Sequence, residues 1–374
     1  GAKENSMSEH DPVIVASELV TGYGFGERLC WEGLLSGRHA FREIERFDAS
    51  KMRSRLAATV PGLSAEHGGH SLLEPMLDFL RPYASKTYGR TELFLASTVG
   101  EIDLLETVEQ DTLHSLLQKA QTVFRVGNGR VVSAACASSN VALARAGALI
   151  QSGRLDTAVI VGADLVSEFV CSGFSSLEAM SPTLARPYDK HRDGLIMGEA
   201  AGVIVLASAQ TAEKYRLKPK ARLSGWGMST DALHITAPVH DGRMLANAIR
   251  QALGGTSPEE VGCVIGHGTG TRYNDEAEIN ALNTVFASPP PLASAKGGCG
   301  HTLGTAGIIQ ACMALHILDT GILFPQTNLL EPEPAAAGMI SGKTQAVKIP
   351  RILSMNSGFG GLNAVLMIEA LTPS

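Results

Sequence analysis

A short strand, a tight turn of small residues and an apolar helix follow one another over residues 131–150. This junction constrains the fold more than any other stretch. Two valines end the expected strand, and the helix is expected to begin at or just after Cys136. From residue 141 to 150 the helix is apolar on nearly every face, which is typical of a buried helix. The sequence therefore predicts a buried helix with a cysteine at its amino end.

Cys136 has two interpretations. At a helix N-terminus it would lie beside unpaired backbone N–H groups and the positive end of the helix dipole, which favour a thiolate. The pKa of Cys136 is then expected to fall below the usual value of about 8.5. Such a residue is a nucleophile, and its own N–H can stabilise an oxyanion. The alternative is that Cys136 is one more small buried hydrophobic residue.

Strands and helices alternate along the chain in two comparable series. The first has expected strands at 12–16, 91–97, 157–163 and 202–206, and helices at 30–37, 72–83 and 101–120. The second has strands at 221–225, 261–265, 351–356 and 364–370, and helices at 242–253, 275–285 and 308–318. Such alternation indicates an α/β layered fold. We expect one half over residues 7–208 and a related half over 209–374, with residues 1–6 as an added leader before a native Met7.

Charge, hydropathy and cysteine spacing exclude several classes of function. A net charge of −6 without a basic stripe argues against nucleic-acid binding. No apolar run reaches the roughly 18 residues of a membrane span, and no signal peptide is expected. The six cysteines show no CxxC spacing, so neither a zinc site nor a disulfide framework is indicated. A reducing cytoplasm is the expected location.

Two further loops of small residues carry polar side chains. Residues 266–271, Gly-His-Gly-Thr-Gly-Thr, present His267 on a glycine scaffold after a strand. The stretch 294–307 holds Lys296 and His301 ahead of a helix. Each histidine alone is more often a structural residue, but glycines on both sides allow close approach by a substrate. Together with Cys136, these side chains indicate a catalytic site.

These residues fall in four ordered motifs. The motifs are ACASS with Cys136, HGTGT with His267, AKGGCGHTLGTAG with Lys296 and His301, and NSGFGGLNAV with Phe359. They resemble the elongating β-ketoacyl-acyl-carrier-protein synthases of the thiolase superfamily. RPYDKHRDGLIMGEAAGVIVL and DALHITAP are similar to the same family, and the resemblance covers residues 13–369. It implies a thiolase-like, five-layered αβαβα fold of two related halves.

The resemblance also implies roles for the motif residues. Cys136 would carry an acyl group as a thioester. His267 and His301 would promote decarboxylation of malonyl on the carrier protein and stabilise the resulting enolate. The N–H groups of Cys136 and Phe359 would form the oxyanion hole, and the Phe359 ring would gate the acyl pocket. Lys296 would tune the charge of the histidines. The supporting residues would be Asp275, Glu278, Gln310, Thr269 and Thr271.

The implied partners are an acyl carrier protein and a second subunit. Phosphopantetheine arrives on the carrier protein, so the chain needs no cofactor or metal of its own. Because the enzyme is itself net negative, it must place positive charge locally to dock an acidic carrier. The candidate docking residues are Arg53, Arg55, Arg186 and Arg192. The dimer is expected to be a homodimer, or a heterodimer with a related ketosynthase-like subunit.

The sequence departs from the family at four places, one of which is Leu362, where the family commonly has threonine. Gln310 replaces a carboxylate that in relatives pairs with the lysine and contributes to a monovalent-cation site. A neutral amide cannot pair a buried ammonium, which argues against a bound cation and leaves the partner of Lys296 open. The gate loop is one residue short, and the region 56–130 is shorter than in fatty-acid elongation enzymes. These departures favour a specialised type II polyketide synthase, such as one for aryl polyenes.

Three related classes are alternatives. A thiolase needs a second catalytic cysteine in a late loop, and Ser357-Gly-Phe-Gly supplies none. Initiating synthases that use acyl-CoA pair cysteine with histidine and asparagine, whereas here the second partner is His301. A non-catalytic partner subunit of the chain-length-factor type usually loses the cysteine, and this chain keeps Cys136. The sequence therefore favours the elongating enzyme.

Overall fold

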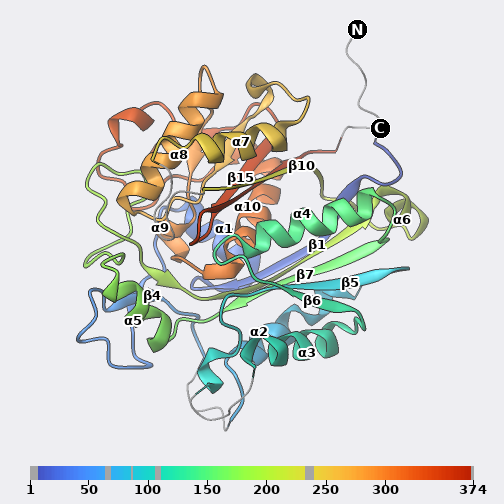
Figure 1. Ribbon diagram of the computed structural model, residues 1–374, viewed down its shortest axis with the longest axis horizontal. Helices are drawn as coiled ribbons and strands as arrows, with labels where there is room; N and C mark the ends of the chain where they lie inside the picture. Colours follow the sequence, from blue (N-terminus) through green and yellow to red (C-terminus); the bar gives the residue numbers. More distant parts are fainter. Residues whose placement is uncertain (1–6, 64–68, 86, 106–110, 232–239, 372–374) are drawn as a thin grey trace.

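The computed structural model describes residues 7–63, 69–85, 87–105, 111–231 and 240–371. The leader expected at residues 1–6 lies outside these ranges, as does nearly all of the DALHITAP stretch. The described chain forms a large mixed sheet whose two halves lie on either side of central helices (Figure 1).

The two halves of the sheet have the same strand order. The first order is β1 (Pro12–Thr21), β9 (Ala200–Ser208), β7 (Thr157–Asp164), β5 (Thr91–Ala96) and β6 (Gly129–Val132). The second is β10 (Ala221–Thr230), β16 (Leu362–Glu369), β15 (Arg351–Ser357), β11 (Cys263–Ile265) and β12 (Leu292–Ala293). In both, the first two pairings are antiparallel and the last two parallel. The duplication predicted from the sequence is therefore confirmed.

Helices form three layers around these two half-sheets (Figure 1). One outer layer contains α2 (Leu73–Leu80) and α3 (Thr112–Phe124), and the other contains α7 (Arg243–Leu253) and α8 (Arg272–Val285). The central layer contains α4 (Ser138–Gln151) and α10 (Ala306–Thr320), with α1 (Glu27–Leu35) packed beside them. This arrangement is the five-layered αβαβα architecture that the resemblance implies.

The core explains why the central strands are continuously apolar. Along β7, Ala158 and Ile160 belong to the core around the central helices, whereas Val159 and Val161 pack with the outer helices α2 and α3. Side chains alternate between the two faces of a strand, so a strand covered on both faces needs apolar residues at every position. All eight residues of β7 are buried.

Shorter elements complete the described chain. The strands are β2 (Gly24–Phe25), β3 (Arg42–Glu43), β4 (Leu56–Ala58), β8 (Met197–Gly198), β13 (Ile322–Leu323) and β14 (Gln345–Ala346). The helices are α5 (Glu168–Ser176), α6 (Ala209–Lys214) and α9 (Lys296–Cys299).

The prediction of one continuous helix over residues 101–120 is wrong for its first half. A single 3₁₀ turn covers Ile102–Leu104, residues 106–110 lie outside the described ranges, and α3 begins only at Thr112. The Asp111 side chain accepts hydrogen bonds from the N–H groups of Leu113 and His114, so it caps a new helix. Apolar residues recur at helical spacing on both sides of this boundary, so the sequence pattern does not reveal where the helix begins.

The central helix α10 has the composition of a membrane span without being exposed. Leu303–Thr320 is long and apolar enough to cross a membrane, but 78% of it is buried inside the protein. Its apolar character therefore matches its place between the two half-sheets.

We predict that the packing of α7 on β10 depends on Gly227. A Cβ at this position would lie 2.0 Å from the backbone oxygen of Ala248 in α7, so Gly227→Ala must push the helix away. We expect the free energy of unfolding to fall by about 1–3 kcal/mol, and thermal melting should show this as a lower melting temperature. Gly255→Ala is the matched control, because a Cβ there meets nothing within 4 Å. Equal melting temperatures for the two variants would contradict this packing.

Candidate active site

Four loops from both halves of the molecule meet between the half-sheets. Cys136 follows β6, and Lys296 and His301 follow β12, the equivalent strand of the second repeat. His267 follows β11, and Phe359 lies in the turn between β15 and β16. In layered α/β proteins, the ends of parallel strands beyond their carboxyl termini are the usual place for ligands. The duplication therefore brings the cysteine loop and the lysine–histidine loop to one place.

Cys136 lies in a tight turn directly before α4. Ala135 has a φ of 48°, in the left-handed region, and α4 begins at Ser138. The Ser138 hydroxyl accepts a hydrogen bond from Ala134 N–H at 2.9 Å and donates to Ala135 O at 2.6 Å. Ser138, the first residue of the helix, thus holds the turn in place. Only 3% of Cys136 is exposed.

The expected low pKa of Cys136 is wrong. Burial raises the pKa of this thiol to about 12, and the Asp164 carboxylate acts in the same direction. The positive charge of Lys296 and the N–H groups of Phe359 and Cys136 lower the pKa, but not enough to offset desolvation. Helix polarity is readable from a sequence, whereas the depth of burial that outweighs it here is not. The resting group is a neutral thiol.

Two backbone donors nevertheless face the sulfur. The N–H groups of Phe359 and Cys136 both act on the Cys136 sulfur and lower the pKa of its thiol. Gly358 lies against the cysteine turn, since a Cβ there would approach Ala134 O to 2.9 Å. The glycine-containing turn between β15 and β16 therefore delivers one of the two donors to the cysteine. Such a donor pair can bind an oxyanion.

His267 and His301 are neutral and have the same tautomer. His301 Nδ1 accepts the N–H of Leu303 at 3.1 Å. His267 Nδ1 lies 3.3 Å from Lys296 Nζ, which can only donate. Because Nδ1 is an acceptor in both rings, the ring proton is on Nε2 in both. Burial, followed by the charge of Lys296, holds both pKa values well below the usual histidine value.

The two imidazoles form a pair of hydrogen-bond donors. Their ring centroids are 5.5 Å apart and their planes are nearly perpendicular, at 89°. Both side chains are almost fully buried. Two neutral N–H donors in a dry site can stabilise a developing negative charge without first losing a proton.

Lys296 is buried beside these rings. Burial lowers its pKa, and among nearby groups the carboxylate of Glu278 contributes most in the opposite direction. The Glu278 carboxyl group in turn accepts hydrogen bonds from the backbone N–H groups of His267 at 2.8 Å and Gly268 at 2.6 Å. Burial raises the pKa of Glu278 to about 7, so the two buried groups shift each other's ionisation, and the same carboxyl group on α8 shapes the His267 loop.

The other supporting residues also hold this loop. Asp275 accepts the N–H of Thr269 at 3.1 Å and that of Tyr188 at 2.8 Å. The hydroxyls of Thr269 and Thr271 are 2.7 Å apart. The structure thus places Asp275, Thr269 and Thr271 around the backbone of the histidine loop, immediately before and within the start of α8.

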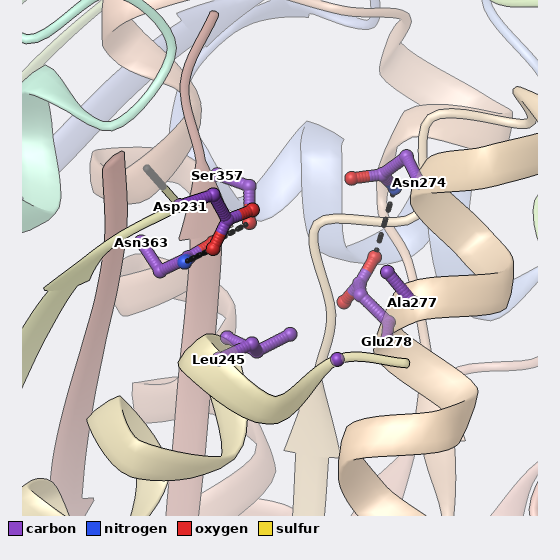
Figure 2. Close-up of a pocket in the computed structure, with 8 residues that line it drawn as sticks. Asp231, Leu245, Asn274, Ala277, Glu278, Ser357 and Asn363 are labelled. Carbon is purple, nitrogen blue, oxygen red and sulfur yellow. Dashed lines mark hydrogen bonds between the residues drawn. The ribbon is translucent and has the colours of Figure 1, made fainter. Parts of the chain in front are cut away.

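A small polar pocket lies behind the loop, and Figure 2 shows its walls. Asn274 and Glu278 line one side, and Asn274 Nδ2 donates to Glu278 at 3.1 Å. On the other side, Asn363 donates to Asp231 at 2.9 Å and its Oδ1 accepts the hydroxyl proton of Ser357 at 2.8 Å. Asn363 therefore braces the turn that carries Phe359 against the end of β10.

Two functional neighbours escaped the sequence analysis. Asn356 Nδ2 lies 3.1 Å from His267 Nδ1 and donates to Gln310 Oε1 at 2.7 Å. Phe174 on α5 has its ring 5.3 Å from that of Phe359 and 6.2 Å from that of His301. Asn356 begins the NSGFGG motif and could have been singled out, whereas no local pattern marks Phe174.

The mouth of the site is aromatic and partly open. Phe359 is 44% exposed, while Phe174 behind it is partly buried. The aromatic pair therefore separates the buried histidines from solvent.

Arg192 is not available for the docking role predicted for it. The side chain of Arg192 is 7% exposed and pairs with Glu333 at 2.8 Å, so its charge is used inside the protein. Arg186 is half-buried and donates to Asn328 O. Arg53 and Arg55 are exposed. Among the described residues, no group of three or more His, Cys, Asp or Glu side chains could hold a metal ion.

Comparison with known proteins gives consistent matches over both halves. Residues 126–212 match the family described as Beta-ketoacyl synthase, N-terminal domain, and residues 220–330 match Beta-ketoacyl synthase, C-terminal domain. The chain is 30% identical over 421 aligned positions to 3-oxoacyl-(acyl-carrier-protein) synthase I, chloroplastic, of Arabidopsis thaliana, covering 98% of this chain and 88% of the relative.

Two further comparisons extend over nearly the whole chain. It is 27% identical over 414 aligned positions to 3-oxoacyl-(acyl-carrier-protein) synthase 2 of Vibrio cholerae serotype O1, covering 98% of this chain and 100% of the relative. Among solved structures, the ishigamide ketosynthase/chain length factor superposes with a TM-score of 0.89 at 26% identity, covering 98% of this chain and 100% of that one.

The raised pKa of Cys136 predicts how this thiol responds to pH. Without substrate, its alkylation by iodoacetamide should rise about tenfold per pH unit from about pH 7 to about pH 9, because the thiolate fraction is still small there. The rate is followed by peptide mass spectrometry, with Cys136→Ser as the control. A rate that levels off near neutral pH would indicate a lowered pKa and contradict the structure.

Proposed function

Because the chain belongs to the β-ketoacyl synthase family, we propose that it joins an acyl group on Cys136 to a malonyl unit on an acyl carrier protein, with loss of carbon dioxide. The protein is then an acyltransferase of the elongating type. The observation that carries this proposal is one buried site in which a thiol faces two backbone N–H groups and two neutral imidazoles carry protons on Nε2.

The first half-reaction transfers the acyl group to sulfur. The Cys136 sulfur attacks the thioester carbonyl of the acyl carrier, and the oxyanion is held by the N–H groups of Cys136 and Phe359. The tetrahedral intermediate collapses, the carbon–sulfur bond to phosphopantetheine breaks, and the proton from Cys136 ends on the departing thiol. Because the resting thiol is neutral, this proton leaves only as the sulfur reacts.

The second half-reaction forms the new carbon–carbon bond. The malonyl thioester oxygen accepts hydrogen bonds from Nε2 of His267 and Nε2 of His301, and carbon dioxide leaves as the electron pair moves into an enolate. The enolate carbon attacks the acyl carbonyl on Cys136. The Cys136 thiolate is expelled and takes up one proton from solvent, which regenerates the resting site.

Lys296 keeps the imidazoles in the form that this step needs. Burial lowers both histidine pKa values and the Lys296 charge lowers them further, so the rings donate N–H groups rather than exist as imidazolium ions. A neutral donor can stabilise the enolate and remain neutral when the carbon attacks.

The carrier protein is proposed to dock beside the aromatic mouth. Arg53 N–H donates to Ser175 Oγ at 2.9 Å, which places this exposed arginine against α5, the helix that carries Phe174. Arg55 follows two residues later and is also exposed. An acidic carrier held here would present its phosphopantetheine arm to the gap beside Phe359.

A dimer is also part of the proposal. β6 is the terminal strand of the first half-sheet, and its residues are only partly buried. A second chain can extend the sheet at this edge, as exposed strand edges favour. The similar ishigamide ketosynthase/chain length factor supports either a second copy or a ketosynthase-like subunit as the partner. The polyene pathway and the cytoplasmic location stay predictions from the sequence.

The test of this function is acylation followed by condensation. After incubation with an acyl-carrier thioester, intact-protein and peptide mass spectrometry should show one acyl group, on Cys136, and the adduct should be lost in Cys136→Ala. Addition of malonyl carrier protein should then yield the 3-oxoacyl product. Absence of any adduct on the wild-type chain would favour a non-catalytic partner subunit instead.

The histidine roles are tested in the same assay. His301→Ala should keep the acyl adduct but slow release of carbon dioxide from malonyl carrier protein by about 100-fold or more, since it removes one enolate donor. His114→Ala, an exposed histidine on α3, is the control. If His301→Ala fails to become acylated, His301 acts on the thiol rather than on the malonyl unit.

A further inference from the structure

Three oxygen atoms converge on one nitrogen of a buried side chain in α10. Gln310 Nε2 lies 3.0 Å from Ser354 Oγ, 3.1 Å from Met355 O and 3.3 Å from Ile265 O. Gln310 is 2% exposed, and the other three residues are fully buried. An amide NH₂ group has two protons, so three oxygens are gathered where two hydrogen bonds can be strong.

Two backbone carbonyls and a hydroxyl are ligands that suit an alkali cation as well as an amide proton. The resemblance implies a monovalent-cation site that uses a carboxylate at position 310. Here that position supplies NH₂, a hydrogen-bond donor, directed at the oxygens themselves. A cation cannot share this space with a donor nitrogen, so the residues present do not fit the ion.

We propose that the amide of Gln310 substitutes for a monovalent cation and makes the site independent of one. Its nitrogen connects the end of β11, which leads into the His267 loop, to β15. The side-chain oxygen of Gln310 accepts a hydrogen bond from Asn356 Nδ2 at 2.7 Å. The same nitrogen of Asn356 lies 3.1 Å from His267 Nδ1. Gln310 is thus a positioning residue that acts on His267 through Asn356.

Charge balance is consistent with this exchange. A carboxylate and a monovalent cation together add no net charge to the interior, and neither does a single amide. The substitution therefore keeps the same formal charge near Lys296 while removing the need to bind and dehydrate an ion. An isolated carboxylate in the same place would be a buried, uncompensated charge, which is costly.

The test compares thermal melting in potassium chloride and in choline chloride at equal ionic strength. The wild-type chain should melt at the same temperature in both salts. Gln310→Glu restores a carboxylate to the three oxygens, so its melting temperature should be several degrees lower in choline chloride. It should rise saturably as potassium replaces choline, because an ion that binds only the folded state stabilises it.

Gln310→Met is the matched control, since it is neutral and cannot donate, accept or hold an ion. It should melt lower than wild type by the same amount in both salts. Saturable stabilisation of the wild type by potassium that is lost in Gln310→Met would overturn the proposal. So would a Gln310→Glu variant that melts identically in the two salts. If Gln310→Glu does not fold, the comparison of wild type with Gln310→Met decides the question.

This inference concerns the scaffold of the site to which the function is proposed, but melting requires no turnover. A chain that fails to form an acyl adduct can still show the predicted salt behaviour. Failure of the function and failure of the inference are therefore separate results.

Discussion

A buried ammonium group beside two neutral imidazoles is the constraint on which the rest of this site depends. Burying Lys296 costs several kcal/mol unless opposite charge lies nearby. Among the nearby groups Glu278 raises the pKa of Lys296 most, and Glu278 accepts hydrogen bonds in turn from the N–H groups of His267 and Gly268. The carboxyl group that interacts most with Lys296 therefore also fixes the loop of His267, whose pKa is lowered by burial and by the lysine charge. Removal of any one of these groups would change the protonation or position of the others.

The duplicated fold supplies the geometry for this network. β6 and β12 occupy equivalent places, so the turns that follow them, carrying Cys136 and His301, lead into the two central helices α4 and α10. Both helices are buried between the half-sheets, which excludes water from the loops at their amino ends. The same burial has opposite consequences for the reacting groups. It lowers the pKa values of the imidazoles, which favours the neutral form proposed to stabilise an enolate, and it raises the pKa of the Cys136 thiol.

Much of this could be predicted from the sequence, for reasons that differ between residues. The strand–helix alternation and the continuous apolar run of β7 were sufficient to predict a layered fold, because local periodicity reports burial on one or two faces. The four motifs identified Cys136, His267, Lys296 and His301. Glycines at their flanks mark loops that approach other groups closely.

What could not be predicted depends on contacts between distant parts of the chain. The pKa of Cys136 was assigned in the wrong direction, because a helix terminus is visible in sequence and desolvation is not. The electrostatic interaction of Lys296 with Glu278 joins α9 to α8, and the contact of Phe174 with Phe359 joins α5 to the turn before β16. Arg192 looked like a surface charge until its partner Glu333 was placed beside it. In each case the missing information was spatial rather than chemical.

The most direct test of this account is the ionisation state of the two histidines, measured by ¹⁵N NMR on the folded enzyme. The account predicts that His267 and His301 remain neutral, with the proton on Nε2, across the pH range in which a free histidine titrates. In Lys296→Met, the loss of the nearby positive charge should move both pKa values upward toward the usual one. An imidazolium signal in the wild type near neutral pH, or a proton on Nδ1 of either ring, would contradict it.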